Sequence, residues 1–175
     1  MAKSGLFHVY PYREEQKVIG RPDRIPRPTL DIELSLGDQD WRTKALIDTG
    51  APLSVFDHLS AQALGIDTRD SAHKRDKVRI GGDRRGVVLV YVTLALPEFP
   101  GMSWTAEAGF FDTEWEAEYG ILGDDGFLDH WVVSFNRYRN YFVVEPIEEW
   151  EQRMPVDLEE EFKKLDSEWE RPTPY

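Results

Sequence analysis

The segment Lys44–Phe56, KALIDTGAPLSVF, constrains the fold most, because it places one aspartate inside an apolar run. Ala45–Ile47 are typical of a buried strand, and Thr49–Gly50 are typical of a turn that follows one. An ionised carboxylate is costly to bury among apolar groups unless a partner compensates its charge. The strand therefore ends on an acid, Asp48, whose partner has to be found elsewhere.

The composition predicts a folded, acidic protein. Its 175 residues are 41% hydrophobic and 13% aromatic, which suits one domain with added segments and argues against general disorder. The formal net charge of −12 opposes binding to nucleic acid and to anionic membrane surfaces, so we expect neither partner. The lack of cysteine excludes disulfides and thiol chemistry. No apolar run approaches the ~18 residues of a membrane span, and residues 1–15 lack a signal-peptide core, which favours a cytoplasmic location.

Hydrophobic periodicity predicts a mostly β body. Alternating residues predict a hairpin of two strands joined by the turn GDQDW, and the run KVRIGGDRRGVVLVYVTLAL predicts two strands around a charged, glycine-rich turn. A further strand and a final hairpin follow. The predicted strand segments are Leu30–Leu36, Arg42–Thr49, the two halves of Lys77–Leu96, Trp104–Phe111, and the strands joined through Asn136–Asn140.

One or two short helices accompany these strands. FDHLSAQALG predicts a helix capped by Asp57, with Leu59, Ala63 and Leu64 on its inner face and Gly65 at its end. GFLDHW, residues 126–131, predicts a short helical turn.

Both ends differ from this body in composition. Residues 1–28 form a predicted N-terminal extension whose four prolines disfavour helix and central strand alike. Residues 149–175 form a predicted acidic, helical C-terminal extension. Within it an amphipathic helix carries one apolar stripe, which packs either on its own sheet or on a second subunit. The stripe consists of Leu158, Phe162, Leu165 and Trp169.

Three motifs occur in a particular order: the strand ending in Asp-Thr-Gly-Ala, the glycine-bearing hairpin RIGGDRRGVVLVYV about thirty residues later, and the apolar step ILG before GFLDHW. This order resembles the retropepsin-like aspartic proteases, in particular the small bacterial relatives of retroviral proteases. The resemblance covers about residues 29–146, and we assign residues 29–148 to the protease-like domain. It implies a closed, retropepsin-like acid protease β-barrel.

The resemblance also implies roles for individual residues. Asp48 would be the catalytic acid, the Thr49 hydroxyl would tie two active-site loops together, and Gly50 would contact substrate through its backbone. Ala51 would line the loop, and a step of three residues would support it from below. The support is Ile121, Leu122 and Gly123, and the covering flap is Ile80, Gly81, Gly82, Asp83, Arg84, Arg85 and Gly86.

A single Asp-Thr-Gly implies a homodimer, because the second carboxylate must come from another copy of the chain. Two such acids lie about 3 Å apart and share one proton, so that one activates a water while the other hydrogen-bonds the carbonyl of a peptide or protein substrate. This chemistry needs no metal and no organic cofactor. The expected function is that of an aspartic endopeptidase.

The sequence departs from the retroviral pattern in three ways, one of which is that about thirty residues precede and thirty follow the resemblance with no counterpart in the minimal fold. Pro52 and Asp124 stand where retroviral members usually carry an acid and an arginine that pair, and the flap tip GGDRRG is charged. Dimer support or contacts to the ends of the substrate must therefore differ.

Other interpretations of these residues stay open. Asp48 could cap its own turn, or the fold could persist as a catalytically silent, dimeric peptide-binding module. Arg84 and Arg85 form either a solvated tip or a surface that favours acidic substrate residues. The four histidines lack ligand spacing, and the acids of DDGFLDH suit a helix start better than a metal site.

Overall fold

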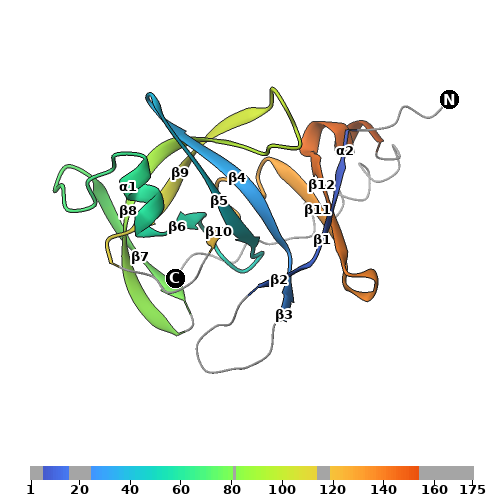
Figure 1. Cartoon of the computed structure of the whole chain (residues 1–175), viewed down its shortest axis with the longest axis horizontal. Coiled ribbons are helices and arrows are strands. Elements are labelled where there is room, and N and C mark those ends of the chain that lie inside the picture. Colours follow the sequence, from blue (N-terminus) through green and yellow to red (C-terminus); the bar gives the residue numbers. More distant parts are fainter. Residues whose placement is uncertain (1–5, 16–24, 81, 114–118, 154–175) are drawn as a thin grey trace, which may run out of the picture.

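The computed structural model describes residues 6–15, 25–80, 82–113 and 119–153 (Figure 1). Most of its strands belong to one seven-stranded sheet. An additional pairing between β4 and β8 closes six of these strands into a barrel and leaves β7 outside the ring. The order across the sheet is β4 (Thr29–Leu36), β5 (Gln39–Ile47), β10 (Gly120–Leu122), β6 (Val55–Phe56), β9 (Ser103–Phe111), β8 (Asp83–Ala95) and β7 (Lys74–Ile80).

The β4–β5 hairpin shows why the barrel has an apolar interior. The two strands are antiparallel over their whole length, from Thr29 opposite Leu46 to Leu36 opposite Gln39. Successive side chains of a strand point to opposite faces, so every second residue of LDIELSL turns inward. Leu30, Ile32 and Leu34 are accordingly completely buried, as the alternation predicts.

A smaller sheet stands beside the barrel, on the side away from the projecting β7–β8 hairpin (Figure 1). Its strands are β1 (His8–Pro11), β12 (Tyr141–Pro146) and β11 (Trp131–Asn136), and a two-stranded sheet of β2 (Arg13–Glu15) and β3 (Ile25–Arg27) follows β1. The predicted final hairpin is confirmed, with the 3-10 helix η1 (Arg137–Arg139) at its turn.

Part of the predicted N-terminal extension contributes to this body. Strand β1 lies at the edge of the smaller sheet, where Pro11 ends it, which agrees with the exclusion of proline from central strands. Tyr10 from this strand is 2% exposed and belongs to the main core. The division of the chain at residues 28/29 and 148/149 stays a prediction.

Helix α1 (His58–Ala63) has the predicted cap, since the Asp57 carboxylate accepts a hydrogen bond from the Ser60 N–H at 2.8 Å. Its predicted inner face is wrong at Leu59, which is 51% exposed. Leu64 is buried as predicted, together with Ser60 and Ala61, because these three positions share one face at helical spacing.

A second helix, α2 (Ile147–Arg153), follows β12. The GFLDHW segment is a series of hydrogen-bonded turns with one helix-like bond, from the Trp131 N–H to the Phe127 carbonyl, and not a regular helix. The predicted amphipathic helix with its stripe Leu158–Trp169 lies outside the described residues. Within the described ranges, no helix has the length and apolar character that crossing a bilayer requires.

Candidate active site

The loop that carries Asp48 is shaped by the position of β10. This short strand lies between β5 and β6, which are consecutive in the chain, and it runs parallel to β5. The chain from 48 to 54 must therefore cross the end of β10 to continue from β5 into β6. At the start of the crossing, the Asp48 N–H donates to the Leu122 carbonyl at 3.0 Å, which extends the β5–β10 ladder by one bond.

Gly123 lies directly beneath this loop. A Cβ atom at Gly123 would be 2.4 Å from the Ala51 carbonyl oxygen, closer than side chains ever approach a backbone atom. The neighbouring backbone then binds the loop, because the Asp124 N–H donates to the Ala51 carbonyl at 2.8 Å and the Asp125 N–H donates to the Pro52 carbonyl at 3.1 Å. The backbone from Gly123 to Asp125 thus contacts the Asp48 loop directly, and the role of the step ILG in supporting an active site stays a prediction. Pro52 and Asp124 cannot form the acid–arginine pair that retroviral members usually have at these positions. Backbone hydrogen bonds join the Asp48 loop to the segment after Gly123 instead.

Ser54 connects the same two segments and was missed by the sequence reasoning. Its hydroxyl is completely buried, donates to the Asp125 carbonyl at 3.0 Å and accepts from the Gly123 N–H at 3.1 Å. Its backbone also binds Asp125 and Gly109. The available signal was a hydroxyl residue inside the apolar run LSVF, because a buried polar group needs a hydrogen-bond partner.

Asp48 is half-buried, and Thr49 and Gly50 beside it are exposed. One oxygen, Oδ1, accepts a hydrogen bond from the Gly50 N–H at 3.0 Å. In the described part of the chain, Oδ2 has no hydrogen-bond partner. The aspartate therefore caps its own turn, as one interpretation predicts, and still presents an oxygen outside that turn.

The β7–β8 hairpin has the predicted strands and turn. Ile80 pairs with Asp83 at its end, and Gly82 has a φ of +98°, a conformation that side chains with a Cβ rarely adopt. Gly81 lies outside the described residues. In Figure 1 the hairpin (green) projects from the barrel.

An apolar cluster brings this hairpin and the Asp48 loop together. Val78 and Ile80 from the hairpin, and Ala51 and Leu53 from the loop, are its half-buried members. We call it the site-side cluster, and its buried members are Val55, Val87, Leu89, Phe111 and Ile121. Residues assigned to the flap, the loop and its support therefore share one apolar surface.

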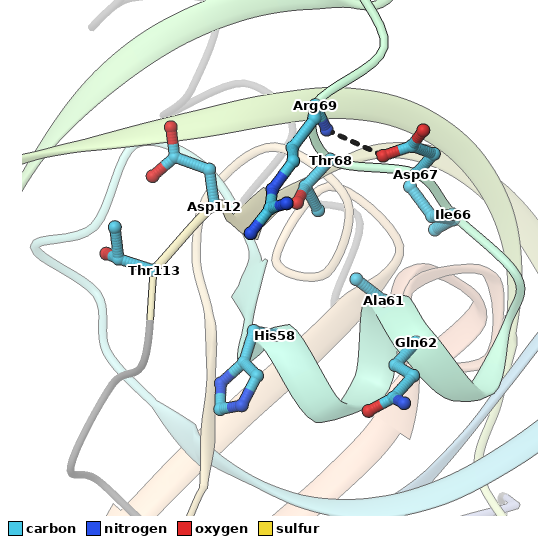
Figure 2. Close-up of a pocket in the computed structure, with 9 residues that line it drawn as sticks. All are labelled: His58, Ala61, Gln62, Ile66, Asp67, Thr68, Arg69, Asp112 and Thr113. Carbon is cyan, nitrogen blue, oxygen red and sulfur yellow. Dashed lines mark hydrogen bonds between the residues drawn. The ribbon is translucent and has the colours of Figure 1, made fainter.

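A separate pocket of about 670 Å³ lies between α1, the segment after it and the end of β9 (Figure 2). Its charged lining is mixed, with Arg69 between Asp67 and Asp112, and the Arg69 N–H donates to the Asp67 carboxylate at 2.9 Å. The lining does not include Asp48 or the hairpin tip. Among the residues that the structure describes, no group of three or more His, Asp or Glu side chains is arranged to hold a metal ion.

Comparison with known proteins adds one finding. No family model matches the sequence, and no curated protein matches it. The crystal structure of a retropepsin-like aspartic protease from Rickettsia conorii is similar over 82% of this chain and 95% of that chain, with a TM-score of 0.53 and 11% sequence identity. The chain has a retropepsin-like fold.

The retropepsin-like fold confirms the predicted closed, mostly β architecture with two short helices. It accounts for the insertion of β10 between β5 and β6, which sets the path of the Asp48 loop. The roles assigned to Asp48, Thr49 and Gly50, and to the hairpin, stay predictions, because a likeness at this level of identity concerns the backbone fold.

Proposed function

We propose that this chain is a homodimeric aspartic endopeptidase in which each subunit contributes Asp48. The observation that carries the proposal is the construction of the Asp48 loop. On a retropepsin-like fold, the Gly50 N–H binds one oxygen of the Asp48 carboxylate, and the other oxygen has no partner in the described part of the chain. The loop also contributes to the site-side cluster, which it shares with the β7–β8 hairpin. One such loop per chain makes the site complete only with a second copy.

In the proposed reaction, the ionised Asp48 of one subunit takes a proton from a water molecule as the water oxygen attacks the peptide carbonyl carbon. The protonated carboxyl of the partner subunit's Asp48 gives its proton to the carbonyl oxygen, which yields a neutral tetrahedral diol. The carbon–nitrogen bond then breaks as the amide nitrogen receives a proton from one carboxyl of the dyad and the other carboxylate takes a proton from a diol hydroxyl. The products are a carboxylic acid and an amine, and the dyad again holds one proton. Two carboxylates that share one proton supply both the base and the acid, so water is the only other reactant.

The substrate would bind as an extended strand between the Asp48 loops and the β7–β8 hairpins. In this mode backbone hydrogen bonds supply affinity, and alternate side chains enter pockets. The site-side cluster offers an apolar wall for one such side chain.

The test is the substitution Asp48→Asn, followed by cleavage of a peptide library and mass spectrometry between about pH 4 and pH 7. We expect kcat to fall by at least about 10³-fold, because the amide neither accepts nor donates the catalytic proton. Asparagine keeps an oxygen for the Gly50 N–H, so the fold should survive. The matched control is Asp38→Asn in the exposed β4–β5 turn, which should cleave like the wild type. Full activity in Asp48→Asn would disprove the proposal.

The peptide-binding module would give a different result. Wild type and Asp48→Asn would then bind a reduced-amide peptide equally, and neither would cleave the corresponding natural peptide. Calorimetric titration of both variants with that one peptide separates the two functions.

A further inference from the structure

Two neighbouring arginines at the tip of the β7–β8 hairpin point in opposite directions. Successive residues of a strand alternate between its faces, and directly paired residues on neighbouring strands share a face. Arg84 pairs with Arg79, whereas Arg85 pairs with Val78. Arg84 is exposed, and Arg85 is half-buried.

The face that holds Arg85 is the one turned toward the Asp48 loop. Along β8, Arg85 lies on the same face of the strand as Val87 and Leu89, and both of these belong to the site-side cluster. Val78, its cross-strand partner, packs on the same cluster together with Ala51 from the loop. Arg84 and Arg79 occupy the opposite face.

Arg85 is half-buried, whereas the other cations of this hairpin are exposed, and two of those exposed cations have ion-pair partners. Lys74 forms an ion pair with Glu107 at 3.0 Å, and Arg75 forms one with Asp112 at 3.6 Å. No ion pair or hydrogen bond engages the Arg85 side chain in the described part of the chain, although Asp83 lies two residues away on the same face. In a chain of net charge −12, this leaves an uncompensated guanidinium beside the candidate site.

We propose that Arg85 is a specificity-determining residue that selects peptides with a glutamate or aspartate side chain at one fixed position relative to the cleaved bond. The inference rests on the proposed function and refines its substrate class. A guanidinium presents a planar pair of N–H donors that matches a carboxylate, and a peptide lying along the hairpin as an added strand directs alternate side chains toward this face. Arg84, on the other face, takes no part.

The experiment uses pairs of reduced-amide peptides that are identical except for Glu or Gln at one position, scanned along the peptide. Binding to the Asp48→Asn protein is measured by calorimetry, and kcat/KM of the natural-amide pairs is measured with wild type. At one position we expect Glu to be preferred over Gln by roughly 5- to 10-fold, with the preference reduced at high salt. Arg85→Gln should abolish this preference, and Arg85→Glu should transfer it to a Lys peptide.

Arg84→Gln is the matched control, because it removes the same charge one residue away on the opposite face. It should retain the preference for Glu. Equal binding of Glu and Gln peptides at every position, or an equal loss in both arginine variants, would overturn the inference. So would dissociation of the Arg85→Gln dimer in sedimentation, which would place the guanidinium in a subunit contact. Failure of cleavage with the binding preference intact would count against the proposed function alone.

Discussion

At the scale of single residues, Ser54 shows how one hydroxyl can hold the Asp48 loop in place. It lies at the far end of the segment that starts with Asp48, and it binds both Gly123 and Asp125 on the supporting segment. All of these contacts are shielded from water by the complete burial of Ser54. Leaving a buried N–H or carbonyl without a partner costs more folding free energy than a typical hydrogen bond contributes. The Ser54 hydroxyl therefore stabilises the fold chiefly by giving the buried Gly123 N–H an acceptor.

The substitution Ser54→Ala should lower the free energy of unfolding by about 1–3 kcal/mol, because it leaves the buried Gly123 N–H without an acceptor. Urea unfolding measures this change, and faster hydrogen exchange at the Gly123 amide would locate it. Ser60→Ala is the matched control. Ser60 is equally buried, but its hydroxyl has no partner among the described residues, so its removal should be neutral or slightly stabilising. Equal destabilisation by both substitutions would contradict this account.

At the scale of elements, strand β1 joins the N-terminal segment to the rest of the molecule through Tyr10. The Tyr10 ring stacks on Phe142 of β12, with centroids 5.2 Å apart, and its hydroxyl donates to Glu98 at 2.9 Å. Burial raises the pKa of the Tyr10 hydroxyl far above its ordinary value, and the hydrogen bond and negative charge of Glu98 raise the pKa further. The neutral phenol is therefore the form that the folded state stabilises.

The substitution Tyr10→Phe should lower the free energy of unfolding by about 1 kcal/mol near neutral pH, through loss of the bond to Glu98. Above about pH 10 the unfolded wild-type chain releases the Tyr10 proton while the folded chain retains it, so wild-type stability falls as pH rises. The variant lacks this proton, and the difference between the two proteins should shrink. Urea unfolding at about pH 7, 9 and 10.5 measures it.

Tyr138→Phe, in η1, is the control for Tyr10→Phe, because it removes the same hydroxyl from a side chain that is 94% exposed. It should match the wild type at each pH. A difference between Tyr10→Phe and wild type that stays constant or grows with pH would show that the phenol does not carry the expected linkage.

The elements that could be predicted are those set by local pattern. The alternation of Leu30, Ile32 and Leu34 predicts a strand and its buried face, and Asp57 predicts the start of α1. The inward face of α1 could not be predicted in the same way. A helix of six residues gives too little periodicity to separate Leu59 from its neighbours, and packing decides which side turns inward.

At the scale of the whole molecule, pairing between distant strands was beyond what periodicity predicts. Nothing in the local pattern of GIL indicates that β10 lies between β5 and β6, or that β4 closes the barrel by pairing with β8. The resemblance carried by the three motifs implied a closed barrel with the step ILG beneath the Asp48 loop, but it did not specify these two pairings. The role of Gly123 was predicted from its motif alone. The physical reason for a glycine there is that the Ala51 carbonyl of the crossing loop leaves no room for a Cβ atom, and this contact is visible only in the folded structure.

The proposed homodimer leads to the last prediction, which concerns how activity depends on the ratio of wild-type to Asp48→Asn chains. Each chain of 20.3 kDa has one Asp48 loop, so on the proposed mechanism a mixed dimer of wild type and Asp48→Asn would hold only one catalytic carboxylate. If subunits exchange freely and mixed dimers are inactive, the active fraction equals the square of the wild-type fraction. An equal mixture at fixed total protein should then retain roughly a quarter of the wild-type activity.

A chain that acted alone would instead retain roughly half of the activity in the same mixture, because each wild-type chain would work independently. The measurement is the initial rate of peptide cleavage across a series of mixing ratios, after incubation long enough for subunits to exchange. A mixing series with Asp38→Asn, which leaves both carboxylates in every dimer, should show no decline. A straight line for Asp48→Asn would refute the shared site, whereas a quadratic curve requires that both subunits contribute to each cleavage.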